Sequence, residues 1–426
     1  MRTVGIIAEY NPFHTGHEYH IRKAKETAGA DYAIIVMSPD YVQRGEPAVF
    51  DKHTRARMAL LGGADLIIEL PICYATGSAE YFAEGAVSLL TQLGVTDVLC
   101  FGAERDDTPL FQEISSVLLC EPEHYKSALK KYLKQGKTYP QARSMALCEY
   151  LTKTGEIPKT KAFEDISAKN AEHFLSSPNN ILGIEYCKAL QKYKSSISPL
   201  PIRRIGSEYN STSLDGAYCS ASAIRKVMQA NVPNDSIETV LPYIPQNSLE
   251  TFLRNLNTVI TADDFLPLLV QQLLSSDSYD AVLDISCDLS DRMRSLRYKL
   301  IGRRYDEIVT LLKTKQITQS RIQRSLLHLT LDIETEAVES FRQNGVIYYA
   351  NALGFRRESS ALLGSIKANS AIPLLTKPSC GTKLLSGAAL QMWKQNEYSS
   401  HLYRSIRSIK TGIQFQTIYE TSPVIL

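Results

Sequence analysis

Short apolar runs alternate with amphipathic stretches of helical period over the first hundred residues. The apolar runs have the length and composition of buried strands and lie at 3–8, 32–37, 66–70 and 97–101. Helical patterns separate them, at about 16–28, 52–62 and 78–93. This alternation predicts an α/β fold with a Rossmann-like parallel sheet and crossover helices.

In such a sheet, ligands bind beyond the carboxyl ends of the strands. His14, Ser38 and Gly102 each fall just past the predicted end of a strand. We therefore expect these three positions to share one crevice.

The remainder of the chain is richer in helical pattern. Residues 105–177 predict a mostly helical insertion, followed by a helix at 180–192, a strand at about 197–205 and a helix at 220–229. From about 235 the pattern changes to long helical stretches, and Pro233 and Asn234 break the chain just before them. We therefore predict a sheet domain over 1–232 and a mainly α-helical domain over 233–426.

The sharpest chemical signal follows the first strand and reads Asn11-Pro12-Phe13-His14-Thr15-Gly16-His17. Two histidines three residues apart at a helix start point the same way, and the free backbone N–H groups there attract phosphate. Gly16 keeps side-chain bulk away from a nucleotide. Attack on an α-phosphate builds negative charge, which imidazole donors stabilise. The segment has the H-x-G-H form of adenylyl- and cytidylyltransferases, so we predict His14 and His17 as catalytic residues.

His14, His17 and His20 also recur at a spacing that metal ligands on successive helical turns can have. No Cys or further His clusters around them in the sequence, and the Asn-Pro-Phe turn before Gly16 is unusual for ordinary helix histidines. We therefore favour a phosphate site and predict no metal ligands.

The loop after the second strand carries Arg44, which can face a phosphate or a carboxylate. A surface turn explains Arg44 equally well. His53, Arg55 and Arg57 lie on the following helix, where arginine is usually solvated.

Two later segments add polar residues. Asn179 and Asn180 at a helix start can be N-caps, or can hold a ribose and phosphates together with Arg203 and Arg204 at the next strand end. The small hydroxyl residues that precede Arg225 favour anion contact at another helix start.

Together these segments resemble the tRNA(Met) cytidine acetate ligase family, within the HIGH-motif nucleotidyltransferase superfamily. The similar stretches span nearly the whole chain and lie at 5–17, 43–48, 67–71, 101–104, 178–186, 221–225 and 351–355. Pro39 stands where the family usually has Gly. Because proline fixes φ and lacks an N–H, we expect that loop to contact a ligand differently.

The resemblance implies a two-step reaction. Acetate attacks the α-phosphate of ATP, which gives acetyl-adenylate and pyrophosphate, and the wobble cytidine of elongator tRNA(Met) then takes the acetyl group as N4-acetylcytidine. Mg²⁺ is expected from ATP chemistry. The implied ATP-binding residues are Ile7, Ala8, Glu9, Tyr10, Asn11, Pro12, Phe13, His14, Thr15, Gly16, His17, Glu18, Tyr19, His20, Gly102, Asn180, Arg203, Arg204 and Arg225.

The formal charge of +2 conceals a basic C-terminal half, with about 20 Lys and Arg against about 12 Asp and Glu from residue 282 onward. Solvated helix faces explain such an excess as well as a polyanion site does. Taken together with the resemblance, the basic excess predicts a tRNA-binding surface. The predicted tRNA contacts are Arg44, Arg292, Arg297, Arg303, Arg321 and Arg324.

Two other functions remain open from the sequence: a small-molecule nucleotidyltransferase that acts on a phosphorylated metabolite, and a non-catalytic RNA-binding protein. The eight cysteines are scattered without a C-x-x-C pair, which indicates reduced thiols. The first strand begins at once, with no signal-peptide pattern before it, so we expect a cytoplasmic protein.

Overall fold

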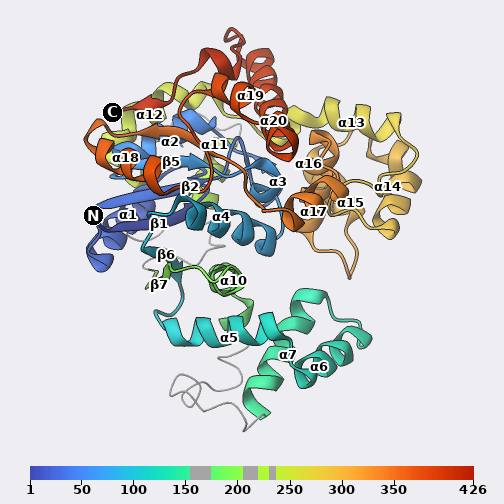
Figure 1. The fold of residues 1–426 in the computed structure, drawn as a ribbon. Helices are drawn as coiled ribbons and strands as arrows, with labels where there is room; N and C mark the ends of the chain where they lie inside the picture. Colours follow the sequence, from blue (N-terminus) through green and yellow to red (C-terminus); the bar gives the residue numbers. More distant parts are fainter. Residues whose placement is uncertain (154–173, 205–218, 230–236) are drawn as a thin grey trace.

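A computed structural model describes residues 1–153, 174–204, 219–229 and 237–426. A central sheet carries helices on both faces, with a helical arm below it and a helical lobe to its right in Figure 1. The strands of the sheet are β1 (Thr3–Ala8), β2 (Tyr32–Met37), β5 (Leu66–Glu69), β6 (Val98–Ala103), β7 (Ser198–Arg203), β8 (Ala350–Phe355), β9 (Leu374–Leu375) and β10 (Val424–Ile425). A separate hairpin pairs β3 (Tyr41–Val42) with β4 (Glu46–Pro47).

The sheet runs in the order β10-β8-β5-β2-β1-β6-β7, and β9 pairs with β8. The five strands from β5 to β7 are parallel, as the alternating sequence predicts. Strand β8 is antiparallel to β5 and brings the C-terminal part of the chain into the same sheet. The strand order reverses between β2 and β6 on either side of β1, and a crevice opens at such a point.

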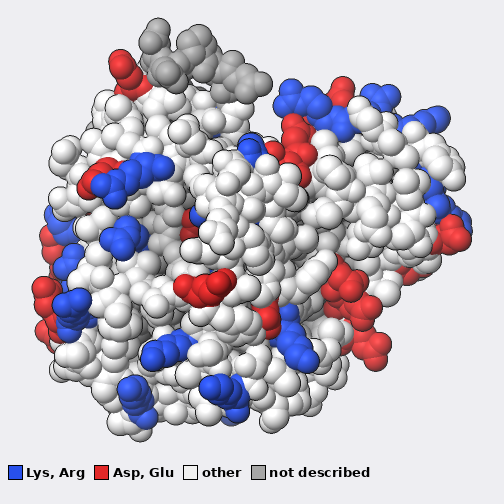
Figure 2. Space-filling model, turned by 90° about the horizontal axis from the view of Figure 1, so that it is seen from above, with Lys and Arg blue, Asp and Glu red and all other residues white. Residues whose placement is uncertain are grey.

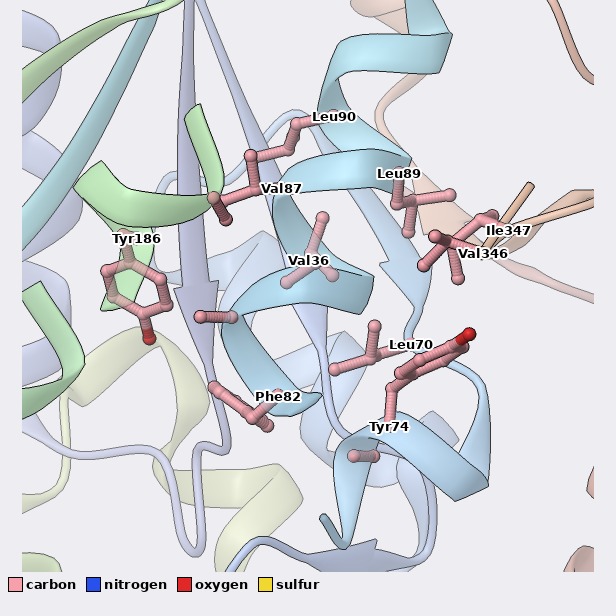
Figure 3. Packing of buried hydrophobic residues seen from close by; sticks show 14 of the residues in the cluster. Val36, Leu70, Tyr74, Phe82, Val87, Leu89, Leu90, Tyr186, Val346 and Ile347 are labelled. Carbon is pink, nitrogen blue, oxygen red and sulfur yellow. The ribbon is translucent and has the colours of Figure 1, made fainter. Parts of the chain in front are cut away.

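The helices of the sheet body are α1 (Thr15–Ala28), α2 (Lys52–Leu61), α3 (Ile72–Ala75), α4 (Ala79–Leu93), α10 (Pro178–Lys192), α11 (Ala221–Gln229), α12 (Gln246–Asn255), α17 (Thr335–Gln343), α18 (Ser360–Asn369), α19 (Gly381–Leu384) and α20 (Gly387–Thr411). Single 3-10 turns lie at Leu241–Tyr243, Leu256–Thr258, Ala262–Phe265, Arg357–Ser359, Pro378–Cys380 and Ile418–Glu420. Helix α4 packs on the sheet through the apolar side chains of Figure 3, where Val36 of β2 lies between Phe82 and Leu90 of α4 in one cluster.

Two helical units extend from this body. The arm consists of α5 (Thr108–Cys120), α6 (Glu123–Lys134) and α7 (Tyr139–Lys153) and is inserted between β6 and α10. The lobe consists of α13 (Leu266–Ser275), α14 (Cys287–Leu300), α15 (Tyr305–Leu312) and α16 (Gln319–Leu331), and it has an apolar cluster of its own. Along the described parts of the chain, no helix is long and apolar enough to cross a membrane.

The predicted strands and helices that fall on described residues are confirmed to within a few residues at each end. Residues 154–173 of the predicted helical insertion lie outside the described residues. One placement is wrong: Gly102 lies inside β6, paired with Ile202, and not beyond the end of the strand. The predicted domain boundary at 231–236 lies outside the described residues, so the division at 232/233 stays a prediction. The C-terminal strands β8, β9 and β10 were not expected from the helical pattern.

Candidate active site

A pocket opens at the carboxyl ends of β1, β6 and β7, between the first turns of α1 and α11. Most of the predicted ATP-binding residues line it: Ile7, Ala8, Glu9, Tyr10, Asn11, His14, Gly16, His17, Tyr19, His20, Gly102, Arg203, Arg204 and Arg225. Arg44, predicted as a tRNA contact, lines it as well. The point at which the strand order reverses therefore lies beside the His14–His17 motif.

His14 begins α1 as its N-cap residue, in extended conformation. The backbone N–H of Gly16 donates to His14 Nδ1 at 3.1 Å. In a neutral ring this hydrogen bond leaves the proton on Nε2, so Nε2 is the donor that His14 can offer to a ligand. The cap thus fixes both the position and the tautomer of the first histidine of the motif.

His17 stacks on His14 with ring centroids 3.7 Å apart and planes 30° apart. Burial lowers the pKa of the His14 ring to about 3, and the positive charges of Arg204 and Arg225 add to that effect. Burial, followed by the two neighbouring histidines, also lowers the pKa of His17 well below its ordinary value. Both rings are therefore neutral hydrogen-bond donors near pH 7, which suits stabilisation of a phosphate by hydrogen bonding.

Positive charge dominates the pocket wall. Arg44, Arg203, Arg204 and Arg225 line it, whereas Glu9 is the one carboxylate among its described lining residues. Arg225 donates to the Asn11 carbonyl at 2.7 Å, which ties α11 to the loop after β1. A polyanion such as a triphosphate fits this charge pattern.

The start of α11 adds further donors. Ser220, Ala221 and Ser222 line the pocket, and Ser222 Oγ accepts from Arg225 Nη2 at 3.1 Å. A nine-residue helix whose N-terminus faces the pocket presents backbone N–H groups to an anion there. The predicted role of this segment agrees with its position.

Five predicted ATP-binding residues do not line the pocket: Pro12, Phe13, Thr15, Glu18 and Asn180. Phe13 is wholly buried, and its ring fills the space beside Gly62, so its role is in the core. Pro12, Thr15 and Glu18 belong to the same turn and helix start but are not among the residues that line the pocket.

Asn180 is structural in this fold. Its Oδ1 accepts from the Glu104 N–H at 3.0 Å, and its Nδ2 donates to the Phe174 carbonyl at 3.1 Å. Its neighbour Asn179 faces the pocket instead and accepts from Arg204 Nη1 at 3.2 Å. Successive helical residues point about 100° apart, so the segment was found but the residue within it was not.

The expectation that Arg55 is solvated is wrong. Its side chain is fully buried, and its guanidinium donates to three backbone carbonyls, those of Glu9, Pro39 and Phe50. Glu9 follows β1 and Pro39 follows β2, so Arg55 fixes the two loops that form one rim of the pocket. Pro39 needs no N–H for this contact, because it offers its carbonyl.

The β3–β4 hairpin joins the pocket to the lobe. The Gln43 N–H donates to Glu9 Oε1 at 2.9 Å on the pocket side. On the other side, Gln323 Nε2 of α16 donates to Glu46 Oε1 at 2.7 Å, and the Tyr305 hydroxyl donates to the Gly45 carbonyl at 3.3 Å.

Most of the predicted tRNA contacts in the lobe make internal contacts. Arg297 pairs with Asp277 at 3.0 Å and Arg324 with Asp284 at 2.7 Å. Arg292 donates to the carbonyls of Leu311 and Leu312, and Arg321 to that of Asp284. These four guanidiniums hold the lobe together, and of the predicted set only Arg303 is exposed there. Figure 2 shows basic and acidic side chains interspersed over the upper face of the molecule.

Among the described residues, no group of three or more His, Cys, Asp or Glu side chains is placed to hold a metal ion. His20 contacts the Cys100 thiol, with 3.5 Å between Nε2 and Sγ, and burial lowers the pKa of His20 to about 4. The three histidines of the motif thus lie along one pocket wall.

The family model for HIGH nucleotidyl transferases matches residues 1–416 of this chain. The curated tRNA(Met) cytidine acetate ligase of Acetivibrio thermocellus is 37% identical over 382 residues, which cover 88% of each chain. That of Clostridium kluyveri is 38% identical over 427 residues, covering 100% of this chain and 99% of the relative. The chain belongs to this family of ligases.

Solved structures of the same family agree with the fold. Thermotoga maritima TmcAL without ligand superposes with a TM-score of 0.89 at 30% identity, over 100% of both chains. A crystal structure of that protein bound with alpha-thio ATP gives a TM-score of 0.87 at 29% identity, again over 100% of both chains. This chain and Thermotoga maritima TmcAL thus share one fold over their whole length.

Several lining residues gave no sequence signal. Phe82, Phe101, Leu182, Tyr186 and Ile202 line the pocket with apolar surface. Their pattern in the sequence is that of core residues, and Phe82 and Tyr186 indeed also belong to the core of Figure 3. Only the fold, which places them along the pocket, distinguishes them from other core residues.

Proposed function

We propose that this protein is an ATP-dependent tRNA(Met) cytidine acetate ligase that works in the cytoplasm. It activates acetate as acetyl-adenylate and transfers the acetyl group to N4 of the wobble cytidine of elongator tRNA(Met). The observation that carries the proposal is the pair of neutral, stacked histidines at the start of α1, facing four arginines in one pocket. The names of the relatives support acetate and tRNA(Met) as the substrates.

In the first step an acetate oxygen bonds to the α-phosphorus of ATP and the bond to the β-phosphate oxygen breaks, which releases pyrophosphate. Negative charge grows on the phosphate oxygens. His14 Nε2 and the His17 ring donate to that charge, and Arg203, Arg204 and Arg225 neutralise the phosphates.

In the second step the cytidine N4 bonds to the acetyl carbon and releases one proton to solvent, the bond from that carbon to the phosphate oxygen breaks, and AMP leaves with the electron pair of that bond. The same donors that received the α-phosphate hold AMP in place. The apolar wall of Phe82, Phe101 and Leu182 excludes water, which would otherwise hydrolyse the mixed anhydride.

Mg²⁺ would enter with ATP. It usually binds substrate phosphates together with one or two carboxylates, and Glu9 is the carboxylate that lines the described part of the pocket. The ion would offset phosphate charge.

The test is carboxylate-dependent exchange between ATP and pyrophosphate. Acetate is compared with formate, propionate and no acid, with and without tRNA(Met). We expect exchange with acetate that is lost when His14 and His17 are both replaced by Ala and kept in His124→Ala, because His124 is exposed on the arm. No exchange with any acid, even with tRNA present, would refute adenylation and favour a metabolite transferase or a non-catalytic RNA binder.

A further inference from the structure

Helix α6 of the arm carries a dense run of basic residues. Residues 126–137 contain five lysines and no acidic residue, and all five lysines are exposed. Lys126, Lys130 and Lys134 recur every four residues and therefore share one helix face. Tyr125 and Ala128 are buried on the opposite side, where α6 packs against α7.

These lysines differ from the basic residues of the lobe. Lys131 turns toward α7, pairing with Glu149 at 3.2 Å and lying over the Tyr132 ring. Lys126, Lys130, Lys134 and Lys137 form no ion pair with any described residue, whereas Arg294, Arg297, Arg304 and Arg324 of the lobe all have a carboxylate partner. The positive charge of this face is uncompensated by the described residues.

An exposed aromatic residue follows the lysines along the chain. Tyr139 follows Lys137 at the start of α7, and 55% of its surface is exposed; Leu133 is 40% exposed. Exposed aromatic rings among basic side chains are typical of surfaces on which unpaired bases stack.

The arm is connected directly to the pocket. The chain leaves the pocket at Gly102 in β6, forms the arm, and returns to the pocket at Asn179 in α10. Helix α5 packs on α10, and Figure 1 shows the arm projecting from the body below β6 and β7. A polymer whose reacting base occupies the pocket has its flanking backbone within reach of such a projection.

We propose that Lys126, Lys130, Lys134, Lys137 and Tyr139, here called the arm surface, bind the phosphate backbone and an unpaired base of the RNA substrate. The proposal rests on the proposed function, since it assigns the RNA of that reaction to this surface. Lysines on one helix face contact successive phosphates as point charges, and the ring of Tyr139 stacks on a base. The lobe then supports the β3–β4 hairpin behind the pocket and does not make the main RNA contacts.

The test compares two triple variants with the same change of charge. In the arm variant Lys126, Lys130 and Lys134 are replaced by Glu; in the control, Lys367, Lys377 and Lys383, which are exposed outside the arm, are replaced by Glu. The affinity for a tRNA(Met) transcript is measured over a series of salt concentrations. We expect the arm variant to bind at least about tenfold more weakly at ~0.1 M salt, with a slope of log K against log salt shallower by about 2–3, because each lost phosphate contact removes roughly 0.7–0.9.

Tyr139→Ala tests the stacking contact alone and should weaken binding by about tenfold without changing the salt slope. Equal affinity and slope in the arm variant and the wild type, or an equal loss in the control, would overturn the proposal. Exchange of pyrophosphate with acetate should be unchanged in the arm variant. Exchange that is absent already in the wild type would refute the proposed function and leave the result for RNA binding standing.

Discussion

Replacing His14 separates its role in folding from its role in chemistry. The side chain caps α1 through Nδ1 and offers Nε2 to a phosphate. Serine also caps helices well but is too short to reach a ligand, whereas alanine does neither. We therefore compare His14→Ser with His14→Ala.

The cap is worth about 1 kcal/mol, so His14→Ala should lower the free energy of unfolding by that amount more than His14→Ser. Both variants lose the same ring contact with His17, which cancels in the comparison. A preorganised donor to the growing charge is worth a factor of about 10²–10³ in rate. Both variants should therefore lose that factor in the acetate-dependent exchange rate.

Denaturant titration measures the first quantity, and exchange at saturating ATP measures the second. His14→Ser with a wild-type exchange rate would show that the imidazole does not touch the transition state. Exchange rates that follow the stability of the two variants would show that His14 acts only through the helix.

Three further predictions concern charge and burial. Because the pKa of His14 is lowered to about 3, the unfolded chain binds a proton near pH 6.5 that the folded chain does not bind. The free energy of unfolding should therefore fall as the pH drops from 6.5 toward 3, by about 1.4 kcal/mol per pH unit for this ring. Denaturant titrations at several pH values should show that His14→Ser lacks this part of the pH dependence. Asn179→Ala should raise KM for ATP about tenfold at unchanged stability. Asn180→Ala should instead lower the free energy of unfolding by about 2–3 kcal/mol, because it leaves a buried and a part-buried backbone group unpaired; equal effects of the two changes would contradict the assignment. Arg55→Lys should lower the free energy of unfolding by about 2–4 kcal/mol, since an ammonium cannot match three carbonyls arranged around a planar guanidinium, and a melting temperature equal to that of the wild type would refute this reading.

The elements predicted best are those whose burial leaves a local pattern. Strands β1 and β2 have the predicted bounds because both are apolar along their whole length, as strands covered on both faces are. Strand β8 escaped prediction because its six residues include Asn351 and Gly354, and its partner β5 lies far earlier in the chain. Pairing across such a distance leaves no periodicity to detect.

The functional residues likewise divide into those with a local sequence signal and those without one. His14 and His17 were found because the motif and the helix start coincide in sequence. Arg324 was assigned to tRNA because its carboxylate partner, Asp284, is 40 residues away, and only the fold brings them together. The burial of Arg55 was not predicted for a related reason. Its partners are backbone carbonyls, which every residue carries, so they leave no signal in the sequence.

The lobe acts on the pocket through the β3–β4 hairpin and does not itself bind a phosphate. Gln43 and Arg44 line the pocket, while Gly45 meets α16 so closely that a Cβ there would lie 2.3 Å from the backbone nitrogen of Arg324. The φ of Gly45 is +81°, which glycine adopts readily. The position of Arg44 is therefore set by α16 on one side and by the Gln43 contact with Glu9 on the other. The lobe thus supports the active site through the hairpin, because moving α16 relative to the sheet would carry Arg44 away from the pocket.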